Sequence, residues 1–152
     1  MTTIIDEMIE YTDRVNRGME KVSPGMEASF TSACVPGDTI WQGDLAIVIA
    51  EDIVPDNFVL VSKSKVKFRG QLVPGSNNGA KHCLADLSSA TVYVPEKWNE
   101  ESLDGPFLRL KKDTTITHPV HGDVKIPSCF SVRLYYQREY DKEQERERRV
   151  RD

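Results

Sequence analysis

Short apolar runs separated by glycine and proline turns dominate the chain between residues 23 and 137. The run Leu45–Ala50 is continuously apolar and rich in branched side chains, which is typical of a strand buried on both faces. The segment Cys129–Gln137 alternates between large apolar and more polar side chains, as a half-buried strand does. Further strands are predicted at Ala28–Ser32, Phe58–Val61, Lys81–Leu84, Ala90–Val94, Phe107–Leu110, Thr114–His118 and Val124–Ile126.

The turn residues show where the predicted strands begin and end. Gly43-Asp44 predicts a bulge or tight bend before the strand that starts at Leu45. Pro119–Asp123 predicts the turn of a β-hairpin, and Trp98 is expected to anchor the polar loop Pro95–Pro106. Turns at such short spacing favour an all-β arrangement over α/β. We therefore expect a mainly β fold, a small barrel or sandwich of about eight strands.

Both ends of the chain carry helical patterns. Apolar residues recur at helical spacing over Thr3–Arg17, so an N-terminal helix is predicted there, either packed on the domain or docked on a neighbouring subunit. Charged residues fill 12 of the last 16 positions, six of each sign, with pairs at i, i+4 spacing that favour a solvated helix. The predicted units are an N-terminal helix (1–22), a β domain (23–137) and a charged C-terminal helix or tail (138–152).

Composition and charge exclude several classes of protein. The chain has 152 residues, 39% hydrophobic and 29% charged, which suits one globular domain rather than a disordered segment. Its formal charge of −4 argues against nucleic acid as a partner. No run is long and apolar enough to span a membrane. Three scattered cysteines without a C-x-x-C pair are typical of a reduced protein, so we expect a cytoplasmic location.

Four cations alternate with other residues between Ser62 and Gly70. In a strand they would share one face, which could hold a phosphate-bearing ligand. The alternative is an edge strand that its lysines protect from aggregation. Because no aromatic side chain shares the face of the cations to stack bases, the second interpretation is favoured over nucleic-acid binding. The cations are Lys63, Lys65, Lys67 and Arg69.

The three histidines of the chain are His82, His118 and His121. If the strand around His82 lies beside the 114–126 hairpin, the three imidazoles converge and could bind a divalent metal ion, with Asp86 or Asp123 as a further ligand. The alternatives are an anion or nucleotide pocket and a purely structural role. A nucleophilic enzyme is disfavoured, because Cys83 and His82 are adjacent in a strand and point to opposite faces.

Four short motifs recur at characteristic positions: Gln42-Gly43-Asp44 before an apolar strand, Gly79-Ala80-Lys81-His82, His118-Pro119-Val120-His121-Gly122, and the closing Gln137-Arg138-Glu139-Tyr140-Asp141. Together they resemble the motifs of a group of small uncharacterised bacterial and phage proteins. The resemblance implies a mostly β domain of bacterial or phage origin and no particular activity. With that origin, the expected location is the cytoplasm of a bacterial host cell or a virion. Ala80 stands where the group carries a further histidine, which removes one potential metal ligand.

These observations favour a non-enzymatic binding or assembly protein, self-associating through its terminal helices. It would present the four cations, together with His82 and His121, to an anionic small molecule such as a phosphate or nucleotide. One alternative is a metal-dependent enzyme with a three-histidine site. A divalent metal ion is the only cofactor that the sequence suggests. The other alternative is a structural component of a phage particle.

Overall fold

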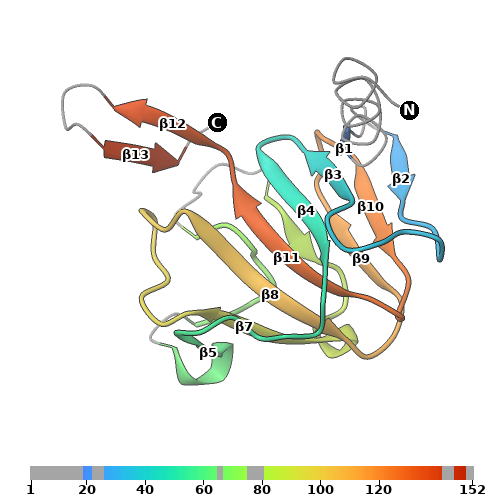
Figure 1. Ribbon diagram of the computed structural model, residues 1–152, viewed down its shortest axis with the longest axis horizontal. Coiled ribbons are helices and arrows are strands. Elements are labelled where there is room, and N and C mark those ends of the chain that lie inside the picture. The colour runs from blue at the N-terminus through green and yellow to red at the C-terminus, as the bar shows by residue number, and fades with distance from the viewer. Residues whose placement is uncertain (1–18, 22–25, 65–66, 75–80, 142–145, 150–152) are drawn as a thin grey trace, which may run out of the picture.

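The structure is a computed structural model that describes residues 19–21, 26–64, 67–74, 81–141 and 146–149. In these ranges the chain forms thirteen strands in three sheets (Figure 1). The largest sheet has seven strands, in the spatial order β1 (Met19–Lys21), β3 (Thr39–Gln42), β4 (Leu45–Ala50), β11 (Ser131–Tyr136), β8 (Asp104–Leu110), β7 (Ala90–Pro95) and β5 (Phe58–Leu60). The second has the order β2 (Glu27–Ser29), β10 (Asp123–Ile126), β9 (Thr114–Thr117) and β6 (Cys83–Leu84). The third is the hairpin of β12 (Arg138–Asp141) and β13 (Arg146–Arg149).

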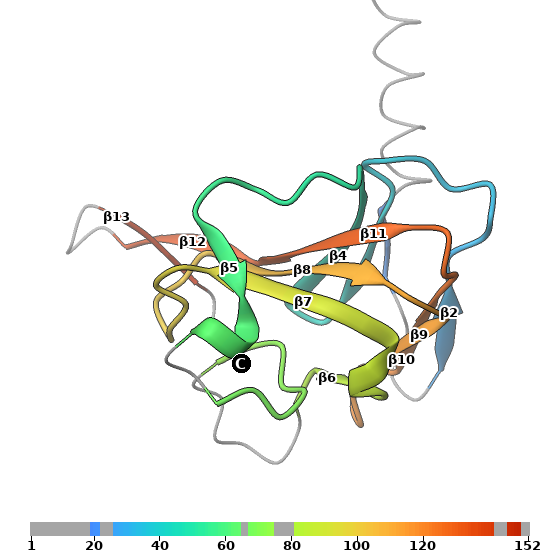
Figure 2. The same ribbon diagram turned by 90° about the horizontal axis from the view of Figure 1, so that it is seen from below.

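The prediction of a mainly β fold is confirmed. The two larger sheets share one hydrophobic core, to which Ile47 contributes from the first sheet and Ile116 and Val124 from the second. Viewed from below, β11, β8 and β7 lie in one layer and β6 and β9 in another (Figure 2). Over the described residues the sheets do not close into a barrel, and each keeps two edge strands.

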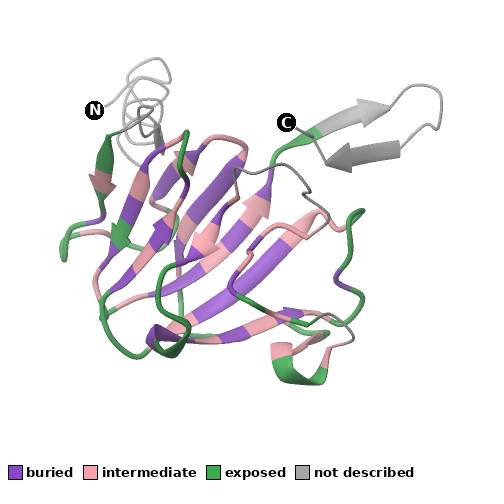
Figure 3. Cartoon of the chain, turned by 180° about the vertical axis from the view of Figure 1, so that it is seen from behind, coloured by how far each residue is buried: buried purple, intermediate pink, exposed green. Residues whose placement is uncertain are grey.

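The centre of the core is the pairing of β4 with β11. Ile47 lies opposite Leu134 and Ile49 opposite Val132, and all four side chains are almost completely inaccessible to solvent. Figure 3 shows this buried stripe running through the neighbouring strands. Branched apolar residues favour such pleated, buried surfaces, which is why the pattern of both strands was readable from the sequence.

Two hairpin turns shape one end of the molecule. Gln42 pairs with Leu45, so Gly43-Asp44 forms the expected tight bend, and Gly43 has the positive φ (61°) that the first central position of a type II′ turn requires. The β9–β10 turn begins at His118, whose carbonyl oxygen accepts from the N–H of Gly122 (φ 89°) at 3.1 Å. Both turns therefore rely on a glycine with positive φ.

The loop between β7 and β8 is anchored as predicted. Trp98 is buried, and its indole N–H donates to the hydroxyl of Tyr136 at 3.0 Å. That hydroxyl donates in turn to the carbonyl oxygen of Leu72 at 2.6 Å. One relay of hydrogen bonds thus connects the loop, the central strand β11 and the segment before β6.

The predicted strand Ser62–Gly70 is wrong. Val61–Lys63 forms a short 3-10 helix (η1), and Ser64 closes it by donating from its backbone N–H (3.1 Å) and its hydroxyl (2.8 Å) to the carbonyl oxygen of Val61. Gly70 then adopts a φ of 98°. Serine side chains compete with strand ladders for backbone partners in this way, so alternation alone did not make a strand.

The prediction of a C-terminal helix is also wrong for the residues described. Arg138–Asp141 and Arg146–Arg149 pair antiparallel as β12 and β13. At the other end, the predicted helix Thr3–Arg17 lies outside the described residues. Residues 19–21, which follow it, form strand β1 and pair in parallel with β3.

Candidate functional site

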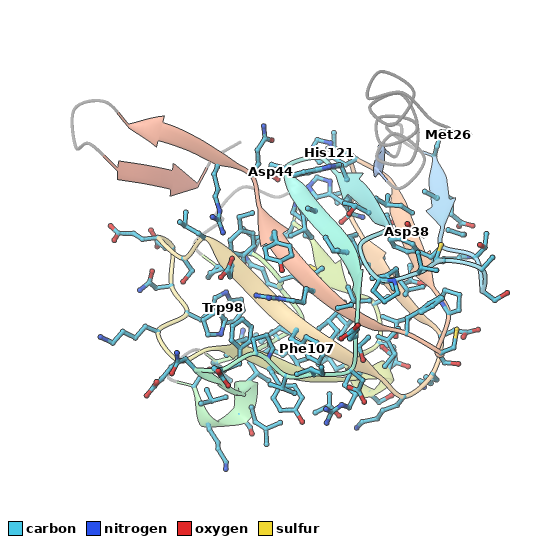
Figure 4. All side chains as sticks on the ribbon, in the orientation of Figure 1. Met26, Asp38, Asp44, Trp98, Phe107 and His121 are labelled. Carbon is cyan, nitrogen blue, oxygen red and sulfur yellow. The ribbon has the colours of Figure 1, made fainter. Side chains whose placement is uncertain are left out.

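Two hairpin turns and the start of a strand, far apart in the sequence, bring five polar residues together. The β3–β4 turn carries Gln42 and Asp44, the entry to β6 carries His82, and the β9–β10 turn carries His118 and His121. We call these five residues the histidine cluster. Figure 4 shows Asp44 and His121 close together at the same end of the molecule.

Gln42 is the fixed point of the cluster. Its side chain is fully buried, and its Nε2 donates to the carbonyl oxygens of Ile116 (2.9 Å) and Gly122 (2.6 Å). Because carbonyl oxygens only accept, these two bonds fix which end of the amide is nitrogen. Its Oε1 is then the acceptor that lies 2.8 Å from Nδ1 of His82. His82 therefore carries a proton on Nδ1.

His82 is 5% exposed and lies between Gln42 and Asp44. Its Nε2 faces Oδ1 of Asp44 at 3.2 Å. Since Nδ1 already holds a proton, a hydrogen bond between Nε2 and Asp44 needs one further proton between these two atoms, on either group. A bound cation would fill the same position.

His118 has the opposite tautomer. Its Nδ1 accepts from the backbone N–H groups of Val120 (3.1 Å) and His121 (3.0 Å), so in the neutral ring the proton lies on Nε2. Burial, reinforced by the charges of His82 and His121, lowers the pKa of His118 to about 4. This imidazole is therefore neutral at pH 7 and holds the β9–β10 turn in shape.

His121 packs on the β3–β4 turn. Its imidazole covers Gly43 so closely that a Cβ on this residue would collide with the ring. The ring centre lies 4.3 Å from that of His118 and 6.1 Å from that of His82. The rings of His82 and His118 are 4.4 Å apart, so the three ring centres form a triangle with His118 at the corner.

The three histidines converge, as the metal hypothesis required, but the three-histidine ligand set does not fit the hydrogen bonds. A metal on Nε2 of neutral His118 would need the proton on Nδ1, where two N–H groups already donate. As the side chains stand, the described residues contain no group of three or more His, Cys, Asp or Glu placed to share one ion.

No contact joins the predicted cations that the structure describes to the histidine cluster. Lys63, Lys67 and Arg69 are exposed along the segment between β5 and β6, whereas Lys65 lies outside the described residues. Asp86, considered as a further ligand, instead caps the 3-10 helix Leu87–Ser89 (η2) and contacts Lys112 at 2.8 Å. Its bonds to Lys112 and Ser88 hold the pKa of that carboxyl well below its usual value. The cysteines at positions 34, 83 and 129 are free, as expected.

The comparison with protein families covers this region. The model of a domain of unknown function, DUF8820, matches residues 41–133, more than half of the chain. The chain belongs to this family. The matched DUF8820 range contains all five residues of the histidine cluster and ends before β12. The resemblance to small bacterial and phage proteins stays a prediction.

The remaining comparisons found no relative. No curated protein and no solved structure matches the chain. In the described ranges, no helix has the length and hydrophobicity needed to cross a membrane.

Sequence reasoning missed Gln42 and Asp44 as members of the site. Both were noticed, but only as the start of a strand and as part of a bend. The available signal was their position: a polar, two-residue hairpin turn directly beside a buried strand places side chains at the rim of the core. Their convergence with His82 depends on the register of two sheets, which the local pattern does not contain.

Proposed function

We propose that the protein is a non-enzymatic assembly protein that associates with copies of itself through its C-terminal hairpin. The observation that carries this proposal is the position of β12 and β13. The hairpin projects beyond the seven-stranded sheet, and its two strands pair with each other rather than with the body of the domain (Figures 1 and 2). We call residues 138–149 the C-terminal arm.

A projecting pair of strands favours association. Isolated two-stranded hairpins are marginally stable in water. Each strand of such a pair also presents a row of backbone N–H and C=O groups that another chain can pair with. The arm is connected to the body at its base, where Nη2 of Arg138 donates to Asp104 at 2.9 Å and the N–H of Gln137 donates to the carbonyl oxygen of Asp44 at 2.9 Å. These two hydrogen bonds hold the base of the arm against the body of the domain.

The charges of the tail favour a second copy of this chain as the partner. The last 16 residues contain six acidic and six basic side chains. A segment with balanced charges of both signs is complementary to itself, whereas a strongly basic or acidic tail would repel its copy. Oligomers of one chain type are also the commonest soluble assemblies.

A non-enzymatic role is supported by the way the histidine cluster is bonded. His82 and His118 are 5% and 4% exposed, and their Nδ1 atoms are bonded to protein groups. General acid–base catalysis needs an imidazole within reach of a substrate proton. The imidazoles of this cluster instead connect the turns of two sheets.

Mass measurement in solution tests the assembly proposal. Multi-angle light scattering on the full chain at tens of micromolar should give a dimer or larger species, and a variant that ends at Gln137 should give a monomer with unchanged near-UV circular dichroism. A full chain that is monomeric, or a shortened chain with the same mass as the full one, would contradict the proposal. A variant lacking residues 1–18 separates the arm from the N-terminal segment, because only loss of the arm should abolish assembly.

That the protein binds an anionic ligand stays a prediction, and fewer observations support it than support self-association. Lys63, Lys67 and Arg69 are exposed, but they lie on a turn and not on one strand face, and His82 is bonded to Asp44. The Lys67→Glu/Arg69→Glu double variant should abolish binding of inorganic phosphate measured by calorimetry. Equal binding by the original chain and the double variant would refute this part.

A further inference from the structure

The contact between His82 and Asp44 has the geometry of two ligands of one metal ion. Ligands that lie about 2.0–2.2 Å from a tetrahedral ion are separated from each other by roughly 3.3 Å. Nε2 of His82 and Oδ1 of Asp44 are 3.2 Å apart. The lone pair of Nε2 faces the carboxylate because the proton of the neutral ring is held on Nδ1 by Gln42.

Gln42 supplies the support that a ligating histidine usually has. Metal-bound imidazoles almost always donate their second N–H to a carbonyl or carboxylate oxygen, which fixes the ring and makes the ligating nitrogen more basic. Oε1 of Gln42 accepts this proton at 2.8 Å, and the amide itself is fixed by two further hydrogen bonds. The support is therefore rigid before any ion binds.

His121 supplies a third donor next to the β3–β4 turn. It packs on Gly43, the residue between Gln42 and Asp44, so its ring lies over the turn that carries the carboxylate. Its plane is inclined by 15° to that of His82, with 6.1 Å between the ring centres. Two imidazoles on one tetrahedral ion have ring centres roughly 5 Å apart. An approach of about 1 Å, through rotation of the half-buried His121 side chain, would bring it into the ligand set.

We propose that Asp44, His82 and His121 form a binding site for a divalent transition-metal ion, with Gln42 as the support of His82. Two imidazoles and one carboxylate are the protein ligands of many Zn²⁺ and Fe²⁺ sites. His118 orients the turn and stays outside the ligand set. The bound ion then lies between Nε2 of His82 and Oδ1 of Asp44, in place of a shared proton. This site is independent of the C-terminal arm and is tested separately.

The test is a titration of the full chain, freed of metal by a chelator and kept reduced, with Zn²⁺ by calorimetry and with Co²⁺ by visible absorption. One ion per chain should bind at tens of micromolar protein, and Mg²⁺ should not compete. The Asp44→Asn, His82→Ala and His121→Ala variants should each bind at least about tenfold more weakly. Asp86→Asn, the same chemical change at an exposed carboxylate, should bind like the original chain.

Four outcomes would overturn the proposal. The first is no saturable binding, which leaves a proton as the only cation between His82 and Asp44. The second is unchanged affinity in Asp44→Asn. The third is loss of binding in His118→Asn with full binding in Asp44→Asn, which would favour the three-histidine site instead. The fourth is a thiolate-to-cobalt absorption band lost in Cys83→Ser, which would move the ion to a cysteine. If His82→Ala does not fold, the less buried Asp44 and His121 positions still decide the test.

Discussion

The imidazole Nδ1–H of His82 donates to the side-chain oxygen of Gln42 over 2.8 Å, and this bond joins the two sheets of the protein. Gln42 ends a strand of the seven-stranded sheet, whereas its own amide donates to carbonyl oxygens of the β9–β10 hairpin. One fully buried glutamine thus determines the tautomer of a histidine and the position of a turn at the same time. The first prediction follows from this position.

Replacing Gln42 with alanine should destabilise the fold by about 3 kcal/mol or more. The change removes three buried hydrogen bonds, one to His82 and two to carbonyl oxygens, and each group left without its partner costs about 1–3 kcal/mol. Urea unfolding followed by fluorescence measures the loss. Gln71→Ala is the matched control: its amide donates to the nearby carbonyl oxygen of Val73 from a half-buried position, so we expect a loss of about 1 kcal/mol. Equal losses in the two variants would contradict the role given to Gln42.

Replacing Gly43 with alanine should displace His121. Gly43 has a φ of 61° and its Cα is covered by the His121 ring, so a methyl group meets both backbone strain and a collision. Gly37 has a φ of 98° but open space around a built Cβ, so Gly37→Ala reports strain without the collision. Gly43→Ala should therefore cost more free energy of unfolding than Gly37→Ala.

A double variant isolates the ring contact. In a His121→Ala background the collision is gone, and the cost of Gly43→Ala should fall by at least about 1 kcal/mol, as a double-mutant cycle measures. If the cost is the same in both backgrounds, His121 does not pack on Gly43 in solution.

Removing the hydroxyl of Tyr136 should weaken the central relay. Tyr136→Phe leaves the indole N–H of Trp98 and the carbonyl oxygen of Leu72 without this partner, and we expect a loss of about 2 kcal/mol in urea unfolding. Tyr93→Phe is the control, because the Tyr93 hydroxyl accepts from Arg109 at 3.2 Å on a half-buried position and should contribute less than about 1 kcal/mol. A larger loss for Tyr93→Phe would refute the relay.

Stability should fall as the pH decreases from about 6.5 to 4, with a contribution from His118. The pKa of His118 is lowered to about 4 in the folded protein, against about 6.5 in an unfolded chain. In this window the unfolded chain takes up a proton that the folded protein does not, so the stabilisation is present above pH 6.5 and is lost toward pH 4. The full contribution is roughly 3 kcal/mol.

The His118→Asn variant separates this titration from all others. Its side-chain oxygen can accept from the N–H groups of Val120 and His121 as Nδ1 does, but it does not titrate. Unfolding free energies measured from pH 4 to 7.5, with a chelator present, should be less steep with pH in the variant than in the original chain. Parallel curves would show that His118 is not held neutral.

The sequence predicted the parts of the fold that burial determines. Leu45–Ala50 and Cys129–Gln137 were recognised because a strand at the centre of a core must bury its apolar side chains, which gives it a clear apolar pattern. The tight bend at Gly43 was recognised because few residues other than glycine adopt its φ. These signals are local in the sequence, and the strands and the bend lie where the pattern predicted them.

The wrong predictions concern segments whose local pattern fits more than one structure. Residues 62–70 alternate, but their second face carries Ser62 and Ser64, which have little apolar surface to bury and can satisfy backbone groups in a turn. The tail has charges at helical spacing and no apolar stripe, so nothing local distinguishes a solvated helix from the hairpin of β12 and β13. The meeting of Gln42, His82 and His118 arises from sheet register alone.

The protonation of the imidazole nitrogens tests the central claim about the cluster most directly. We propose nitrogen-15 NMR of the imidazoles in metal-free protein at pH 7, with assignments from the His82→Ala and His118→Asn variants. His82 should show a proton on Nδ1 that is protected from exchange, and His118 should show a proton on Nε2 and an unprotonated Nδ1. An unprotonated Nδ1 in His82, or a protonated Nδ1 in His118, would contradict the account.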